Sequence, residues 1–142
     1  MKKLYPLLFI LFFIYWSCEE QKDDGETVIL WGQDYSIENT IELNLPDSGL
    51  TGEIPPEIGN LTNLTNLTLY NNQLTGSIPP EIGNLTNLGL LNLSDNQLTG
   101  IIPDEICNQG DSSPDLGNNQ LCPPYPSCIE DYVGEQDTSD CP

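Results

Sequence analysis

The sequence predicts an α/β solenoid, because one apolar pattern recurs along the chain with a fixed period. Three segments begin at Leu43, Leu67 and Leu91, 24 residues apart, and share the pattern Leu-x-Leu-x-x-x-x-Leu-x-Gly-x-Ile-Pro. A unit of this length cannot bury its apolar face alone and must stack on its neighbours. We expect each Leu-x-Leu core to be a short strand that points its Leu side chains inward and the residues between them outward.

The residues after each strand core predict a turn and then a short helix. Ser48, Asn72 and Asn96 occupy one phase, where a side-chain amide can bond unpaired backbone groups and stacked copies form a ladder. The following Pro-Pro-Glu-Ile-Gly-Asn-Leu segments begin with proline, which suits a first helical turn. Gly59 and Gly83 are expected to end these helices.

The repeat resembles the leucine-rich repeat family, in its plant-type variant with Gly-x-Ile-Pro, over residues 36–122. The resemblance implies a right-handed stack with short parallel strands on a concave face and short helices or 3-10 turns on a convex face. A degenerate fourth copy ends the array at Leu121, with Pro114 where the first strand leucine would stand. Ile37 and Thr40 lie in register with later leucines, so a partial repeat opens the stack.

The first residues predict export. Lys2 and Lys3 precede a 13-residue apolar run, which is short for a membrane span of about 20 residues and suits a signal peptide. Ser17-Cys18 after this run resembles the lipobox of bacterial lipoproteins, although Tyr15 and Trp16 stand where a small or aliphatic residue is usual. The resemblance implies lipidation at Cys18. A signal peptide without lipidation and an uncleaved anchor are the alternatives.

The segment after Cys18 is acidic and prone to turns, which predicts a flexible tether. Its Gln-Lys-Asp-Asp run resembles a signal for the outer surface of the outer membrane, so we expect a cell-surface or outer-membrane lipoprotein, with secretion as the alternative. The predicted organisation is a lipoprotein-type signal peptide (1–17), the tether (18–26), an N-terminal cap with the partial repeat (27–42), three full repeats and one degenerate repeat (43–122), and a Cys/Pro-rich cap and tail (123–142).

The charge of the chain excludes some partners. After Cys18 there are 22 acidic residues against Lys22 alone, a net charge of −21, and from Gly25 onward the sequence holds no Lys, Arg or His. Nucleic acid is excluded as a partner because binding to its phosphates requires cations. Attraction to anionic lipid surfaces is excluded for the same reason, so contact with a membrane is expected only through a lipid anchor.

The four cysteines after Cys18 predict two disulfides that staple a C-terminal cap over the open end of the stack. Cys122 and Cys128 can close a local loop, which would leave Cys107 with Cys141, but all three pairings remain open. A four-cysteine zinc site is the rival interpretation, and the absence of a Cys-x-x-Cys pair argues against it.

Catalysis and cofactors are not expected. Without His or Arg the chain cannot build a Ser-His-Asp or Cys-His site. Its acidic residues fall at exposed phases of the repeat or in the tails, so a paired-carboxylate enzyme is the weaker hypothesis. No metal site is predicted, since no Asp-x-Asp-type loop is present, although weak calcium binding stays open.

The predicted function is recognition of an extracellular protein or glycan, by a monomer, through the concave face. Tyr70 and Leu90 interrupt an otherwise polar surface, and an exposed tyrosine is typical of recognition surfaces. The alternative is a structural spacer or surface coat that has no specific ligand. The residues expected to point outward on this face are Glu42, Asn44, Asp47, Asn66, Thr68, Tyr70, Asn71, Leu90, Asn92, Ser94 and Asp95.

Overall fold

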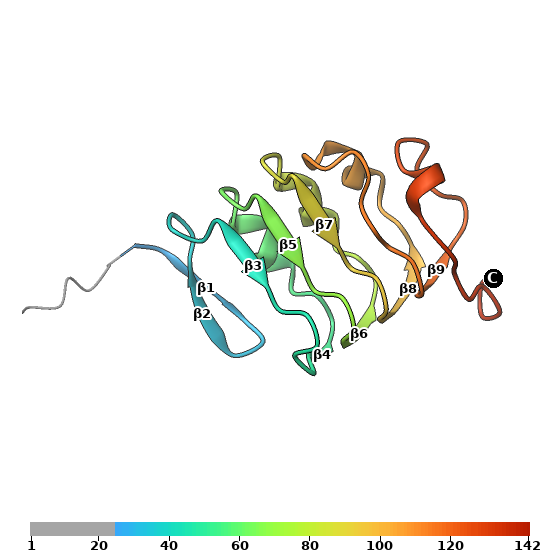
Figure 1. The fold of residues 1–142 in the computed structure, drawn as a ribbon, viewed down its shortest axis with the longest axis horizontal. Helices are drawn as coiled ribbons and strands as arrows, with labels where there is room; N and C mark the ends of the chain where they lie inside the picture. The colour runs from blue at the N-terminus through green and yellow to red at the C-terminus, as the bar shows by residue number, and fades with distance from the viewer. Residues whose placement is uncertain (1–24) are drawn as a thin grey trace, which may run out of the picture.

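A computed structural model describes residues 25–142 as a stack of repeats between an N-terminal hairpin and a cysteine-rich C-terminal segment (Figure 1). The predicted signal peptide and Cys18 lie outside the described residues. Within residues 25–142, no helix is both long enough and apolar enough to span a membrane.

The first sheet contains one short strand from each full repeat. Strands β3 (Glu42–Asn44), β5 (Asn66–Thr68) and β7 (Leu90–Asn92) pair in parallel, in that order. Their central leucines lie side by side and are buried. The predicted strand phase is therefore confirmed.

A second parallel sheet forms where the Leu-Thr-Gly part of the repeat becomes extended. It contains β4 (Thr51–Gly52), β6 (Gln73–Gly76), β8 (Gln97–Ile101) and β9 (Gln120–Cys122), in that order. Strand β9 belongs to the degenerate fourth copy, so this copy still pairs with the repeat before it. The sequence interpretation did not anticipate this sheet.

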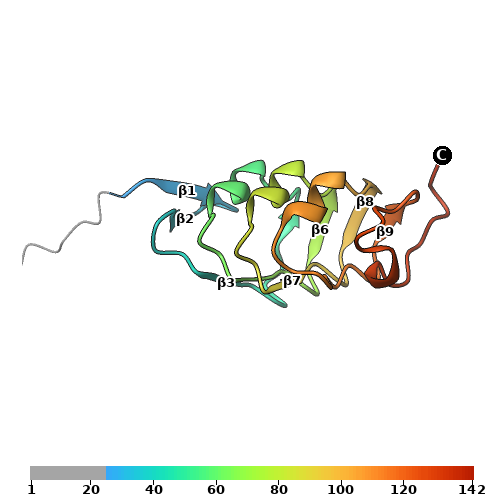
Figure 2. The same cartoon turned by 90° about the horizontal axis from the view of Figure 1, so that it is seen from above.

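Short 3-10 helices occupy the side of the stack opposite the first sheet (Figure 2). They are η1 (Pro56–Asn60), η2 (Pro80–Asn84) and η3 (Asp104–Asn108). In η1 the N–H of Ile58 donates to the carbonyl oxygen of Pro55 at 3.0 Å, as a three-residue turn requires. The described part of the chain contains no α-helix.

Gly59 and Gly83 lie inside these helices and do not end them in a left-handed conformation, contrary to the sequence expectation. A Cβ on Gly59 would lie 2.5 Å from the carbonyl oxygen of Glu81, and one on Gly83 would lie 2.4 Å from that of Glu105. These glycines therefore let successive 3-10 helices pack closely. Cys107 takes the same phase in η3, the last of these stacked helices.

The core lies between the two sheets and the 3-10 helices. It is made of leucine and isoleucine side chains that are nearly inaccessible to solvent, including Leu43, Leu67, Leu69, Leu74, Ile82 and Leu91. At the N-terminal end, β1 (Thr27–Leu30) and β2 (Gln33–Ser36) form an antiparallel hairpin. Val28 and Leu30 of this hairpin are buried, and Trp31 and Tyr35 pack partly against the core.

Asparagine side chains connect successive repeats. The Oδ1 atom of Asn72 accepts hydrogen bonds from the N–H groups of Ser48 and Leu50, both at 3.0 Å. Its Nδ2 atom donates to the carbonyl oxygens of Leu45 and Leu69, at 2.8 and 2.9 Å. The predicted ladder is present, and its next members are Asn96 and Asn119.

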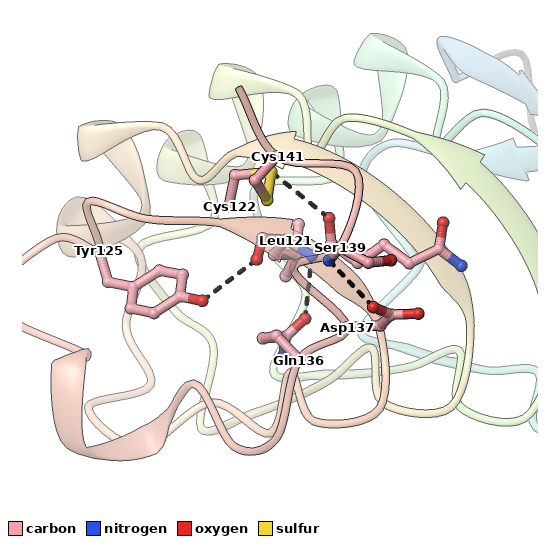
Figure 3. The surroundings of a disulfide bond; sticks show 8 residues. Leu121, Cys122, Tyr125, Gln136, Asp137, Ser139 and Cys141 are labelled. Carbon is pink, nitrogen blue, oxygen red and sulfur yellow. Dashed lines mark hydrogen bonds between the residues drawn. A yellow bond between two sulfur atoms is a disulfide. The ribbon is translucent and has the colours of Figure 1, made fainter.

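Two disulfides staple the C-terminal end of the stack. Cys107 pairs with Cys128 and Cys122 pairs with Cys141, with Cα–Cα separations of 5.8 and 5.6 Å. The local loop between Cys122 and Cys128 does not form, because each of these cysteines reaches a segment distant in sequence. Figure 3 shows the Cys122–Cys141 bond beside Tyr125, whose hydroxyl donates to the carbonyl oxygen of Leu121 at 3.1 Å.

The tail after the helix η4 (Glu130–Tyr132) continues the ladder with a glutamine. The Oε1 atom of Gln136 accepts from the N–H of Leu121 at 3.0 Å, and its Nε2 atom donates to the carbonyl oxygens of Leu116 and Val133, both at 2.8 Å. Beyond it, hydrogen bonds from Ser139 hold the pKa of Asp137 below its usual value.

Candidate functional site

The candidate site is the solvent side of the β3-β5-β7 sheet, which we call the open face. Strand register aligns Glu42 with Asn66 and Asn66 with Leu90 in one row. A second row aligns the residues two positions further along each strand, which are Asn44, Thr68 and Asn92. All six side chains are exposed or half-buried. Parallel pairing thus brings the predicted residues of the three repeats together.

Hydrogen bonds between side chains hold the second row in place. The hydroxyl of Thr68 donates to Oδ1 of Asn44 at 2.8 Å, and Nδ2 of Asn44 donates to a carboxylate oxygen of Glu42 at 3.1 Å. One repeat further, Nδ2 of Asn92 lies 3.4 Å from Oδ2 of Asp115. These contacts join side chains of neighbouring repeats into a fixed polar surface.

A row of alternating aspartate and asparagine borders this surface at the turn after each strand. Asp47, Asn71, Asp95 and Asn118 have φ angles of 52°, 53°, 54° and 55°. Asp and Asn tolerate this left-handed conformation better than most residues do, which explains the residue types at this phase. Nδ2 of Asn71 donates to Oδ1 of Asp47, and Nδ2 of Asn118 donates to Oδ1 of Asp95 at 2.8 Å.

Apolar side chains are exposed on this face and just before its first strand. Tyr70 is 37% exposed and Leu90 is 43% exposed, as expected from strand alternation. Ile41, which is 57% exposed, was missed because alternation counted back from Leu43 places it inward. The corresponding positions of the next two repeats hold Thr65 and Gly89, which are not large apolar residues. This could have indicated that the position is not part of the core.

Ser94 is the one predicted face residue that the structure buries, at 6% exposure. Its hydroxyl donates to Oδ1 of Asn92 at 2.7 Å, and its N–H donates to the same atom at 3.0 Å. The side chain is thus turned back onto its own strand. The next repeat has Gly117 at the corresponding position, so the surface here carries no large side chain.

The geometry does not favour a metal centre on this face. No three Cys, Asp or Glu side chains between residues 25 and 142 are placed together as metal ligands would be. The carboxylates of the open face are distributed over three repeats, with Glu42 and Asp47 in the first, Asp95 in the third and Asp115 in the fourth, each beside an amide donor. This arrangement suits contacts to a partner spread over several repeats.

Comparison with known proteins assigns the repeat to a family. The Leucine Rich Repeat family model matches residues 39–61, 63–85 and 87–109. None of the curated proteins compared matches the chain.

Solved structures with the same repeat are similar in both sequence and fold. The PEPR1–AtPEP1 structure is 40% identical with a TM-score of 0.60, covering 62% of this chain and 12% of that one. The plant peptide hormone receptor RGFR1 in complex with RGF2 is 47% identical with a TM-score of 0.54, covering 56% and 13%. A plant ice-binding protein is 41% identical with a TM-score of 0.56, covering 59% and 27%.

This chain therefore spans less than a third of the length of each of these three proteins. Their ligands differ, so the shared repeat does not by itself select one. What they share with this chain is the solenoid fold of the repeats and about two fifths or more of the aligned residues. The chain belongs to the leucine-rich repeat family.

Proposed function

We propose that this chain is a non-enzymatic recognition module that binds an extracellular peptide or protein segment through its open face. The observation that carries the proposal is the exposure of Tyr70 and Leu90 on that face. The other strand residues that point to this side are exposed or half-buried, whereas the leucines of the same strands are buried. Aromatic side chains that stay exposed beside fixed polar groups are common in binding surfaces.

The neighbours in structure support a peptide or protein as ligand, since RGFR1 is described as a peptide hormone receptor in complex with RGF2. The open face here is three strands wide, which at about 4.8 Å between strands is a small surface. We therefore expect weak binding by one copy and effective binding by many copies on one surface.

The proposed location is the outside of the cell, with Cys18 as the lipid-bearing anchor. The two disulfides support export, since such bonds persist in oxidising compartments. The acidic segment from Glu19 to Glu26 would serve as the tether between anchor and stack. Replacement of Cys18 by serine should then abolish detergent partitioning of the mature protein. A wild-type protein that begins elsewhere than Cys18 and is free in the medium would contradict the anchor while leaving the binding proposal intact.

The binding proposal is tested with the full chain in a nonionic detergent against an array of extracellular peptides, proteins and glycans. We expect saturable binding to a peptide or protein that weakens by at least about tenfold in Tyr70→Ala and Leu90→Ala. The matched controls are Tyr132→Ala, which removes a 49% exposed tyrosine from the C-terminal cap, and Ile29→Ala, which truncates a 63% exposed side chain on β1. These controls should bind as the wild type does.

The second candidate is a spacer or coat, which the uniform acidity of the chain favours because like charges keep neighbouring copies apart. It predicts no saturable partner on the array. Saturable binding that only a glycan shows would keep the recognition role and replace the proposed ligand class.

A further inference from the structure

Tyr70 lies on the repeat between two aspartates of the open face. The N–H of Asp47 donates to the carbonyl oxygen of Tyr70 at 3.3 Å, and the N–H of Asn71 donates to that of Ser94 at 3.1 Å. Asp47 and Asp95 therefore stand one repeat to either side of the Tyr70–Asn71 pair. With about 4.8 Å between strands, the two aspartates are about 10 Å apart.

The two aspartate side chains are held in position before any partner arrives. Asn71 donates to one oxygen of Asp47, and Asn118 donates to one oxygen of Asp95. The other oxygen, Oδ2, of each aspartate has no hydrogen bond within the described part of the chain. Each carboxylate thus presents a free acceptor whose orientation is already fixed, which reduces the entropy lost on binding.

The surface beside Tyr70 leaves room for a partner side chain. Toward the C-terminal end of the stack, the corresponding positions hold Ser94, which is buried, and Gly117, which has no side chain. Leu90 adds an exposed apolar contact on the same sheet. An aromatic ring with open space beside it and carboxylates on both sides suits a cation, since cations are attracted to aromatic faces and to carboxylates.

The charge of the open face indicates that its partner is positively charged. No Lys, Arg or His occurs between residues 25 and 142, so no internal cation neutralises these carboxylates. Glu42 and Asp115 add further negative charge to the open face. A face of one sign attracts partners of the opposite sign and repels acidic ones.

We propose that the segment recognised by the open face is a basic, extended peptide whose Arg or Lys side chains dock beside Tyr70 and pair with Asp47 and Asp95. This inference rests on the proposed function and names its partner class. Arginine suits the site best because its planar guanidinium both stacks on an aromatic ring and bonds carboxylates in pairs. Two arginines three residues apart in a polyproline II segment point to the same side and are about 9 Å apart, which is close to the spacing of the aspartates.

The test measures binding of a fluorescent peptide to the full chain in nonionic detergent, with EDTA present to remove divalent cations. The probe contains two arginines three residues apart and a leucine for apolar contact with Leu90. A second probe replaces both arginines with neutral citrulline. We expect saturable binding of the arginine probe that weakens with salt. The citrulline probe should bind at least about tenfold more weakly.

The variant Asp47→Asn/Asp95→Asn removes both charges while keeping residue types that the fold already accepts at this φ, in Asn71 and Asn118. We expect it to weaken the arginine probe by at least about tenfold. The matched control, Glu57→Gln/Glu105→Gln, removes the same charge from the 3-10 helices and should change binding by less than about twofold. Tyr70→Phe should retain binding, because the ring remains, while Tyr70→Ala should lose it.

Equal weakening by both double variants, or equal binding of both probes, would overturn the inference, since the contact would then be diffuse attraction. An array partner that depends on Tyr70 and Leu90 but not on Asp47 and Asp95 would preserve the proposed function and overturn the basic segment. No binding of any probe or array member would overturn both.

Discussion

Asn119 and Gln136 donate to the same acceptor, the carbonyl oxygen of Leu116, at 2.9 and 2.8 Å. Asn119 also accepts from the N–H of Leu98, and Gln136 accepts from that of Leu121. Gln136 therefore bonds the backbone of the last turn in the same way that Asn119 bonds the backbone one turn earlier. The tail is thus the last member of the hydrogen-bonded ladder. It is joined to the stack by the Gln136 side chain and by one isolated β-bridge between Asn119 and Gln136.

Replacing Gln136 with methionine, which is similar in length and has no amide, should destabilise the protein by about 1–3 kcal/mol, because backbone groups of Leu121 and Val133 would lose their partner. Urea unfolding measures this change. Gln73→Met is the control, since Gln73 is exposed and its side chain makes no hydrogen bond. A Gln136 variant as stable as this control would contradict the role of Gln136 as a rung.

Asn72→Ala should cost about 1–3 kcal/mol of stability, since five backbone groups each lose one side-chain hydrogen bond. The control makes the same substitution at Asn84, an exposed residue of η2 whose side chain makes no hydrogen bond. Thermal unfolding of the two variants should separate them clearly. If both melt like the wild type, the ladder does not contribute to stability as argued.

Leu69→Ala removes a fully buried side chain from the centre of the stack and should destabilise by about 2–5 kcal/mol. Leu90→Ala, on the open face of the adjacent repeat, should change stability by less than about 0.5 kcal/mol. Chemical denaturation of both variants gives the comparison. Similar losses in the two would show that the inward and outward phases have been misassigned.

Gly83→Ala should destabilise by about 1–3 kcal/mol, because its Cβ would lie 2.4 Å from the carbonyl oxygen of Glu105 and force η2 and η3 apart. Gly89→Ala is the matched control, since the nearest atom to its Cβ is 3.8 Å away. A melting temperature for Gly83→Ala equal to that of Gly89→Ala would argue against close packing of the 3-10 helices.

The disulfide pairing predicts which cysteine substitutions are equivalent. Cys107→Ser/Cys128→Ser should be no less stable than Cys107→Ser alone, and thiol titration should find one free thiol fewer in the double variant than in Cys107→Ser. Each bond closes a loop of about 20 residues, so each should contribute about 3 kcal/mol. If Cys107→Ser/Cys141→Ser were instead as stable as Cys107→Ser alone, Cys107 would be paired with Cys141 and not with Cys128.

The sequence alone determined the solenoid, the strand positions and the burial of the leucines. These follow from residues within one repeat, because a short periodic unit buries its apolar side only by stacking. The outward positions of Tyr70 and Leu90 followed from the same alternation, and the asparagine phase predicted the ladder.

Other features were decided only in three dimensions. The need for Gly59 comes from Glu81 of the next repeat, and the pairing of Cys122 with Cys141 comes from the path of the tail. The burial of Ser94 comes from a hydrogen bond to Asn92, which strand alternation does not include. Contacts between repeats, and between the last repeat and the tail, join residues that no local pattern relates, so they became visible only when the chain was stacked.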